Sequence, residues 1–272
     1  MSLPPVLPRA FAHRDHAHAT PLADALALGF PGIEVDVWLR DGVLLVGHDE
    51  DELSPSLTLA GAYLEPLAAR VRERSLLPGW AGSFLLMVDV KTEARASYRA
   101  LDALLRDHPS MLTSWHDGHE RTGPVTVLVS GNRATGTIAG QRDRLAGYDG
   151  RLPDLRRRWF RRVDASLVPL VSADWEKVIR WDGTQRLSRR ARRRLARLVS
   201  DAHQQGRKIR FWATPDHRGN ARAAVWALLC DVGVDYINTD DLTGLADFLL
   251  ARHDTAHPPL TRPRSGAAVT RT

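Results

Sequence analysis

The chain has 272 residues, of which 43% are hydrophobic, and a single cysteine, Cys230. This is enough for a full hydrophobic core, whereas one cysteine excludes an intrachain disulfide framework and a structural zinc site built from thiolates. The formal net charge of +6 and the pI of about 10.0 favour anionic partners such as phosphate esters, nucleic acid or acidic membranes, without selecting among them.

Residues 1–9 contain neither a long apolar segment nor a positively charged leader. The sequence as written therefore predicts neither a signal peptide nor a transmembrane helix, and we expect a soluble cytoplasmic protein, or a secreted one if a leader was removed. We expect residues 1–8 to be an N-terminal extension and 9–252 to be one domain. Residues 253–272, which contain three prolines, are expected to form a disordered tail.

Short apolar runs alternate with helical patterns along the whole chain. Strands are predicted at 9–13, 32–38, 43–47, 84–90, 124–130, 167–172, 208–213 and 234–238. Helices are predicted near 20–29, 94–107, 188–205, 219–232 and 241–252, while 110–123 and 147–162 read as loops or lids. This alternation predicts an α/β domain with a largely parallel sheet.

A closed eight-stranded TIM (β/α)8 barrel and an open doubly wound sheet both satisfy this pattern. The barrel is favoured by length, because such domains typically have about 250 residues. It is also favoured by polar residues at the ends of several strands, namely Asp89, Lys91, Ser130, Asn132, Asn238 and Asp240. An open doubly wound sheet is expected to carry a glycine-rich phosphate-binding turn, GxGxxG, after an early strand, and no such turn occurs there.

Acidic residues interrupt the second predicted strand. Apolar and acidic side chains alternate over residues 33–37, so a strand places Glu34 and Asp36 on one face, and Asp89 ends a later strand. Three carboxylates at strand ends suit Mg²⁺ or Ca²⁺, which prefer oxygen ligands. The alternative is that they form salt bridges with the many arginines.

Two further residues near strand ends have chemistry suited to a phosphate ester. Lys91 lies two residues after Asp89 on the same face, where it would neutralise a phosphate oxygen, although an ordinary strand-end lysine fits as well. Trp212 shares a face with Arg210 and would form a wall for a substrate headgroup, although a single tryptophan is also typical of a core.

Two other motifs have competing readings. His16 and His18 match the paired metal ligands of amidohydrolase barrels, but those enzymes need further histidines on later strands, and the remaining histidines fall in helical or loop patterns. The arginine runs at 156–162 and 186–197 fit the solvated face of a packed helix or a surface attracted to anionic lipid or nucleic acid.

Several motifs occur in the order of a known superfamily. A histidine ends the first strand (residues 11–14), Glu-x-Asp ends the second (33–37), and His-Asp follows an Asp-Gly turn (41–49). In this order the chain resembles the glycerophosphodiester phosphodiesterase and phosphatidylinositol phospholipase C superfamily. Residues 88–91, Val-Asp-Val-Lys, look like its third-strand metal carboxylate and phosphate lysine, and Trp212 resembles the late tryptophan of the sphingomyelinase D branch.

Within this superfamily, the chain looks most like the fungal "altered inheritance of mitochondria" phosphodiesterase-like proteins. The matching stretches are 20–22, 63–67, 129–133, 148–151, 210–216 and 233–242. One departure is that the superfamily's His-Arg-Gly becomes His13-Arg14-Asp15, which leaves the choice of substrate open.

The resemblance implies a barrel with its site at the C-terminal rim, and a role for each matching residue. Glu34, Asp36 and Asp89 would hold one divalent cation, Mg²⁺ or Ca²⁺, which acts as a Lewis acid. His13 and His48 would divide the general acid and base roles. The substrate or its phosphate would be held by Arg14, Lys91, Trp212, Arg210, Asn132 and Asn238.

The leading hypothesis is thus a metal-dependent phosphoric diester hydrolase, or a cyclising phosphodiesterase, acting on glycerophosphodiesters or phospholipid headgroups. Its expected partners are the small-molecule diester and, at most peripherally, an anionic membrane, with neither nucleic acid nor an obligate protein partner. Two alternatives remain at this point: a non-catalytic barrel that binds phosphorylated ligands or anionic surfaces, and an amidohydrolase-type metal hydrolase.

Overall fold

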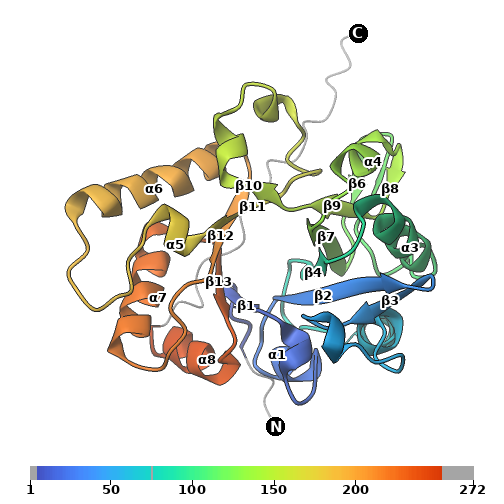
Figure 1. Cartoon of the computed structure of the whole chain (residues 1–272), viewed down its shortest axis with the longest axis horizontal. Helices are drawn as coiled ribbons and strands as arrows, with labels where there is room; N and C mark the ends of the chain where they lie inside the picture. Colours follow the sequence, from blue (N-terminus) through green and yellow to red (C-terminus); the bar gives the residue numbers. More distant parts are fainter. Residues whose placement is uncertain (1–4, 75, 253–272) are drawn as a thin grey trace.

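The computed structural model describes residues 5–74 and 76–252, and these form a nearly closed barrel of parallel strands with helices around it (Figure 1). The barrel strands are β1 (Ala10–Ala12), β2 (Gly32–Arg40), β4 (Phe84–Val90), β7 (Val125–Gly131), β9 (Ala146–Tyr148), β10 (Gly150–Arg151), β11 (Leu170–Asp174), β12 (Lys208–Trp212) and β13 (Tyr236–Thr239). They run in the order β10-β11-β12-β13-β1-β2-β4-β7-β9. Since only Asp149 separates β9 from β10, these two short strands together occupy one position of an eight-position barrel, which confirms the predicted fold.

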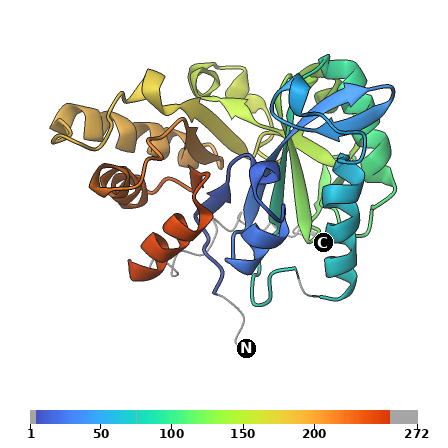
Figure 2. The ribbon, with the colours of Figure 1, turned by 60° about the horizontal axis from the view of Figure 1, so that its bottom comes forward.

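Helices lie on the outside of the barrel wall (Figures 1 and 2). The α-helices are α1 (Ala23–Ala27), α2 (Glu65–Arg72), α3 (Ala94–Arg106), α4 (Thr135–Gly140), α5 (Trp175–Val178), α6 (Arg189–Gln204), α7 (Asn220–Val232) and α8 (Leu242–Ala251). The 3₁₀-helices are η1 (Asp15–Ala17), η2 (Glu50–Glu52), η4 (Leu152–Arg156) and η5 (Phe160–Arg162), and η3 (Ala60–Leu64) is a π-helical turn. Across the described residues, we find no helix that combines the length and the apolar character needed to span a bilayer.

The alternation of side chains along each strand builds two separate cores. Outward-facing residues such as Ile33 and Val35 pack against the helices in the larger core. A smaller cluster fills the barrel interior and consists of Phe11, Leu85, Met87, Leu128, Leu170 and Tyr236. This apolar layer closes the interior below the polar residues at the carboxyl ends of the strands.

The segment 43–47, predicted as one of eight similar strands, does not belong to the barrel wall. Its strand β3 (Val43–Val46) pairs antiparallel with β2, in register from Val37↔Val46 to Arg40↔Val43. The turn between them is Asp41-Gly42, and both residues have positive φ, of 47° and 81°. This turn sends the chain back along β2, so the segment forms a hairpin instead of crossing over to a parallel position.

The prediction of a loop or lid over 147–162 is wrong at its start, because this segment begins inside the strand pair that closes the barrel. β9 pairs with β7 and β10 pairs with β11, both parallel. A Cβ on Gly147 would come within 2.8 Å of the Leu167 carbonyl oxygen, so the close packing here requires glycine. The other predicted loop, 110–123, contains a hairpin of β5 (Ser114–His116) and β6 (His119–Arg121), and β5 also pairs with β8 (Asp143–Arg144).

Of the predicted segments outside the domain, the tail at 253–272 and the first four residues of the extension at 1–8 lie outside the described residues.

Candidate active site

The candidate site lies where the barrel strands end. Parallel pairing aligns Asp36 of β2 with Asp89 of β4, and Asp89 with Ser130 of β7. His13 directly follows β1, which lies between β2 and β13 in the barrel. Polar residues from the first four barrel strands therefore converge on one rim, as expected for the carboxyl ends of parallel strands.

Glu34, Asp36 and Asp89 come together as a carboxylate cluster. One oxygen atom of each lies within 4.8 Å of the others, and no further group of three metal-ligating side chains occurs among the residues that the structure describes. Asp36 Oδ2 is buried, and Lys91 Nζ lies 3.3 Å from it but without the geometry of a hydrogen bond. Three hard oxygen donors, one of them buried and without a hydrogen bond, fit a Mg²⁺ or Ca²⁺ ion.

Lys91 lies against this cluster, with Nζ 3.1 Å from Asp89 Oδ1 and 3.3 Å from Asp36 Oδ2. Burial raises the pKa of Asp36 to about 6, the neighbouring carboxylates add to the rise, and Lys91 opposes it. Burial and the charge of Glu34 also raise the pKa of Asp89. Asp36 and Asp89 therefore lack enough positive charge around them, which a divalent cation would supply.

Glu34 differs because Arg210 neutralises it across the barrel interior. Arg210 Nη1 donates to Glu34 Oε2 at 2.6 Å, and Nε donates to the Ser172 hydroxyl at 2.8 Å. Glu34 and Arg210 are 6% and 2% exposed. Burial acts to raise the pKa of Glu34, but the Arg210 guanidinium and His13 outweigh it and hold this pKa below its usual range. Arg210 thus orients one candidate ligand and keeps it ionised.

His13 is held by a residue from the last barrel strand. Its Nδ1 donates to Asp240 Oδ1 at 2.9 Å, and Arg14 Nη2 donates to Asp240 Oδ2 at the same distance. Burial acts to lower the pKa of His13, but the hydrogen bond to Asp240 and the charge of Glu34 raise it overall. Burial likewise opposes ionisation of Asp240, yet its bonds from His13 and Arg14 lower its pKa to about 2. The pair therefore favours an imidazolium at His13 with its Nε2 edge unused by Asp240.

His48 follows the β2–β3 hairpin and is the more exposed of the two histidines. Its Nδ1 lies 3.0 Å from Asp49 Oδ2, and its backbone N–H donates to Glu52 Oε2 at 2.8 Å. The side chain is 41% exposed, against 32% for His13. Each candidate histidine is thus oriented by a carboxylate at Nδ1.

The three remaining predicted site residues occupy different settings. The Asn132 side chain donates to the carbonyl oxygens of Lys91 and Thr92, so it braces the turn that carries Lys91. Asn238 is 4% exposed, and neither of its amide atoms has a hydrogen-bond partner. Trp212 ends β12, is 37% exposed, and has Lys177 Nζ 5.8 Å from its ring centre.

Two residues beside His13 have roles that sequence reasoning missed. Asp15, at the position of the superfamily's glycine, is fully buried and accepts hydrogen bonds from the Leu22 N–H at 2.6 Å and the Tyr63 hydroxyl at 3.0 Å. It anchors the loop after β1. Asp240 was noted only as a polar residue at a strand end, and pairing it with His13 requires the first and last barrel strands to be neighbours.

His16, one of the two histidines of the amidohydrolase reading, belongs to η1, and both of its ring nitrogens are buried without partners. Burial lowers its pKa to about 4. Within the described part of the chain, neither His16 nor His18 joins a group of three metal-ligating side chains. The described residues therefore give no support to the histidine metal centre that an amidohydrolase would need.

Comparison with known proteins agrees with this geometry. Residues 5–76 match the family model described as AIM6-like phosphodiesterase domain, and residues 208–243 match that of the Glycerophosphoryl diester phosphodiesterase family. The chain is 28% identical over 285 residues to Altered inheritance of mitochondria protein 6 of Eremothecium gossypii, covering 90% of this chain and 70% of that protein. It is 27% identical to the homolog from Arthroderma benhamiae, covering 84% and 78%. In sequence the chain is thus similar to the AIM6-like phosphodiesterases and, through them, to the glycerophosphodiester phosphodiesterase superfamily.

A solved structure supports the fold of this superfamily for the chain. The crystal structure of a glycerophosphoryl diester phosphodiesterase from Parabacteroides distasonis aligns with a TM-score of 0.52 at 13% identity, over 96% of this chain and 90% of that one. The first family match includes His13, Glu34, Asp36 and His48, and the second includes Arg210 and Trp212. The two matches thus cover the neighbouring barrel strands β12, β13, β1 and β2, and Glu34 of the first match forms an ion pair with Arg210 of the second.

Proposed function

We propose that this protein is a metal-dependent phosphoric diester hydrolase, or a cyclising phosphodiesterase, that acts on glycerophosphodiesters or phospholipid headgroups. The observation that carries the proposal is the carboxylate cluster of Glu34, Asp36 and Asp89, with Lys91 beside it and the paired His13 on the same rim. The cluster would hold Mg²⁺ or Ca²⁺, which when bound supplies a Lewis acid for a phosphoryl oxygen.

A phosphodiester carries one negative charge, and two cationic side chains are available to hold it. Lys91 presents a compact ammonium group, and Arg14 presents a guanidinium whose orientation is fixed by Asp240. Asn238 adds an amide without a partner in the barrel interior, and Trp212 adds an exposed indole at the rim. We assign the phosphate to Lys91 and Arg14, and the organic headgroup to Asn238 and Trp212.

The electrostatics of His13 support a division of the proton transfers between the two histidines. An imidazolium paired with Asp240 is suited to protonate the leaving oxygen as its bond to phosphorus breaks. In the same displacement, His48 takes the proton of the attacking hydroxyl as that oxygen bonds to phosphorus. If the hydroxyl belongs to the substrate, a cyclic phosphate forms; if it belongs to water, the diester is hydrolysed directly.

Purified protein assayed with glycerophosphocholine, a lysophospholipid and phosphatidylinositol, with and without a chelator, tests the proposal. We expect turnover of at least one diester, loss of turnover with the chelator, and a decrease of about 100-fold or more in kcat for His13→Ala and for His48→Ala. His119→Ala, an exposed histidine on the β5–β6 hairpin, is the matched control. Absence of turnover on every diester, or turnover unaffected by both histidine changes, contradicts the proposal.

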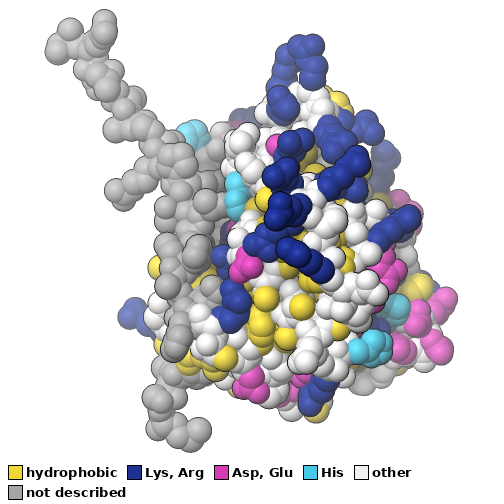
Figure 3. Space-filling view, turned by 90° about the vertical axis from the view of Figure 1, so that its left-hand side faces the viewer, with side chains coloured by type: hydrophobic (Ala, Val, Ile, Leu, Met, Phe, Trp, Pro, Cys, Tyr) yellow, Lys and Arg dark blue, Asp and Glu magenta, His cyan; other side chains and the backbone are white. Residues whose placement is uncertain are grey.

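A second candidate function, binding to an anionic membrane surface, is favoured by a separate feature of the same chain. Twelve exposed arginines, which we call the arginine surface, cover η4, η5 and the first part of α6 (Figure 3). They are Arg156, Arg157, Arg158, Arg161, Arg162, Arg186, Arg189, Arg190, Arg192, Arg193, Arg194 and Arg197. Among the described residues, only Arg157 and Arg192 of this set form ion pairs with carboxylates.

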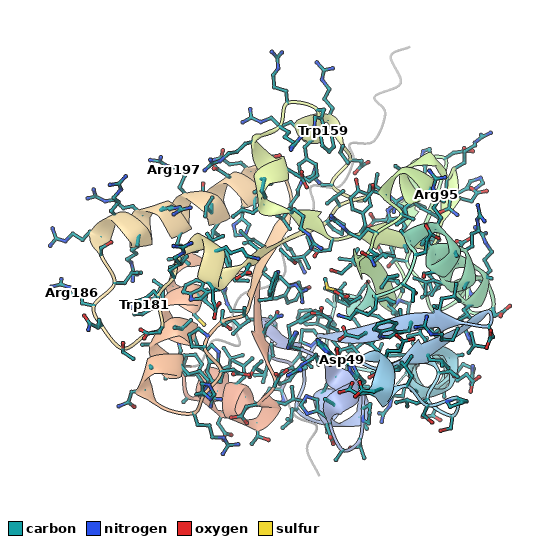
Figure 4. The ribbon with its side chains drawn as sticks, in the orientation of Figure 1. Asp49, Arg95, Trp159, Trp181, Arg186 and Arg197 are labelled. Carbon is teal, nitrogen blue, oxygen red and sulfur yellow. The ribbon has the colours of Figure 1, made fainter. Side chains whose placement is uncertain are left out.

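The composition of the arginine surface suits a lipid headgroup layer. Trp159 lies among the arginines and is 53% exposed, and an amphipathic indole between cations is typical of peripheral membrane contacts (Figure 4). Each arginine near an anionic bilayer contributes roughly 1 kcal/mol of attraction. The loop with Trp159 follows β10, so it extends from the carboxyl ends of the strands, where the candidate site lies. We propose that this surface holds the protein on the membrane that contains its substrate.

Sedimentation with vesicles tests this second proposal. We expect binding to vesicles of phosphatidylcholine with phosphatidylserine, and little binding to phosphatidylcholine alone. The pair Arg190→Gln and Arg194→Gln on α6 should weaken binding on the order of tenfold. The matched pair Arg95→Gln and Arg99→Gln on α3 removes the same charge at the same spacing and should have little effect. Equal effects of the two pairs contradict a specific surface.

A further inference from the structure

A second cavity lies at the opposite end of the barrel from the candidate site. It has a volume of about 690 Å³, and its lining includes the first or second residue of five barrel strands: Leu85, Thr126, Leu170, Lys208 and Tyr236. The candidate site lies instead toward the carboxyl ends, where Asp89 is near the end of β4 and His13 and Asp240 directly follow β1 and β13. A volume of this size is ordinary for a small-molecule site.

An apolar layer separates the two ends. Phe11 and Tyr236 are in ring contact at 5.4 Å in the barrel interior. Arg210, which pairs with Glu34 at the candidate site, lies over Phe11 at 4.9 Å, whereas Lys208 lies over Tyr236 at 4.8 Å. Arg210 thus lies on the candidate-site side of the two aromatic rings, and Lys208 lies on the cavity side. Because the rings stand between them, a ligand in this cavity would not reach the carboxylate cluster.

Lys208 supplies the cavity with a cation that lacks a carboxylate partner. Its Nζ donates to the Tyr236 hydroxyl at 2.8 Å, and no carboxylate of the described residues lies within 4.0 Å of it. Burial acts to lower its pKa, but Tyr236 and the more distant Asp235 raise it overall, so the amine is charged at neutral pH. An ammonium group has three N–H donors, and two of them remain for a bound anion.

The rest of the cavity wall is apolar or already hydrogen-bonded. Trp80 and Trp115 contribute indole rings, and the Trp115 Nε1 donates to Glu120 at 2.9 Å. The hydroxyls of Thr113 and Thr126 bond to each other at 2.8 Å. The wall therefore offers aromatic surface for an aliphatic chain, while Lys208 is the one cation among the residues described as lining it.

We propose that this cavity binds an amphiphile with a single anionic head group, which contacts Lys208 while its aliphatic chain packs against Trp80 and Trp115. A carboxylate and a phosphate monoester have the same chemistry toward an ammonium group, so a fatty acid and an alkyl phosphate are the two sources. The inference is independent of the proposed phosphodiesterase activity, since the apolar layer separates the two sites.

Calorimetric titration of the full chain with decanoate and, separately, with decyl phosphate tests this inference. We expect binding of at least one with one-to-one stoichiometry and a change in tryptophan fluorescence, and which of them binds identifies the source. Decanol and decyltrimethylammonium carry the same chain without the anion, and both should bind at least tenfold more weakly. Failure of both anions to bind, or equal binding of decanol, overturns the proposal.

Substitutions of residues that line the cavity test whether the ligand binds there. Lys208→Met keeps the length of the side chain and removes its charge, and we expect at least tenfold weaker binding of the anionic ligand. Lys177, one of the other two lysines of the chain, is exposed on α5. The control variant Lys177→Met should therefore leave binding unchanged. Leu170→Trp fills the cavity and should block binding with Lys208 in place, with thermal unfolding used to verify that both variants fold. Unchanged binding in Lys208→Met also overturns the proposal.

Discussion

His13 Nδ1 lies 2.9 Å from Asp240 Oδ1, which joins the residue after the first barrel strand to the residue after the last one. Burial alone would lower the pKa of His13, and Asp240 contributes both a hydrogen bond and a charge that raise it. Asp240→Asn should therefore lower the pKa of His13. If His13 acts as the acid, the alkaline limb of kcat/KM should move to lower pH.

Titration of the His13 ring by nuclear magnetic resonance, together with the pH profile of turnover, checks this prediction. Asp235→Asn is the matched control, because Asp235 bonds to His203 Nε2 at 2.8 Å in a second His–Asp pair away from the rim. An unchanged His13 pKa in Asp240→Asn would contradict the electrostatic role assigned to Asp240.

Cation binding should depend on pH through Asp36. Its pKa is about 6 in the folded protein against an ordinary value of 3.8, so without a cation this group contributes stability below pH 3.8 that is lost as the pH rises through 6. A cation must displace the proton, so its affinity should increase with pH up to about 6 and then level off. Calorimetric titration with Mg²⁺ and Ca²⁺ at several pH values measures this dependence.

Removing one carboxylate should weaken the cation site. We expect Asp89→Asn to reduce the affinity for the divalent cation by at least tenfold and to abolish the rise in melting temperature that the cation produces in the unchanged chain. Asp102→Asn, on the outer helix α3, removes the same charge and should leave cation affinity unchanged. The same cation affinity in Asp89→Asn would show that the cluster is not the site.

Gly131 should be intolerant of a side chain. Its φ is +63°, and a Cβ there would lie 2.5 Å from Asp89 Oδ1 and from the Val90 carbonyl oxygen. Gly131→Ala should cost about 1–3 kcal/mol in the free energy of unfolding and displace Asp89, so cation affinity should fall as well. Gly136→Ala in α4 has open space and should be neutral or slightly stabilising. Denaturant unfolding of both variants provides the measurement.

The buried bond between Tyr63 and Asp15 should matter for stability. Tyr63→Phe leaves a buried carboxyl oxygen without its 3.0 Å hydrogen bond, which should cost about 1–3 kcal/mol. Tyr148→Phe, at another buried tyrosine, removes a hydroxyl that forms no hydrogen bond with the described residues, and should cost less. If urea unfolding finds both variants equally stable, Asp15 does not anchor the loop through Tyr63.

Much of the barrel was predictable because its strands are apolar runs of ordinary length, as in residues 84–90. The strand at 146–151 escaped prediction because two glycines and Asp149 interrupt its apolar pattern. Hairpin pairing of 43–46 was predictable in principle, since Asp41-Gly42 is a strong turn signal. Periodicity reports which face a residue occupies, but not which strand lies beside it.

The same limit applies to the site. The cluster of Glu34, Asp36 and Asp89 followed from alternation and from strand ends, and the structure brings these three together. The bonds of Asp240 to His13 and of Arg210 to Glu34 did not follow, because they join residues 227 and 176 positions apart. Contacts of this kind exist only once the barrel closes.

The single residue between β9 and β10 has a wider consequence. Asp149 is fully buried and accepts hydrogen bonds from Ser130 on β7, Arg151 on β10 and Ser172 on β11. At this seam the Asp149 side chain links three barrel strands, in addition to the backbone pairing of β9 with β7 and of β10 with β11. Chain halves divided near Asp149 would still pair through β1 and β13, so a split at this seam would measure how much one buried carboxylate adds to the assembly of the barrel from two fragments.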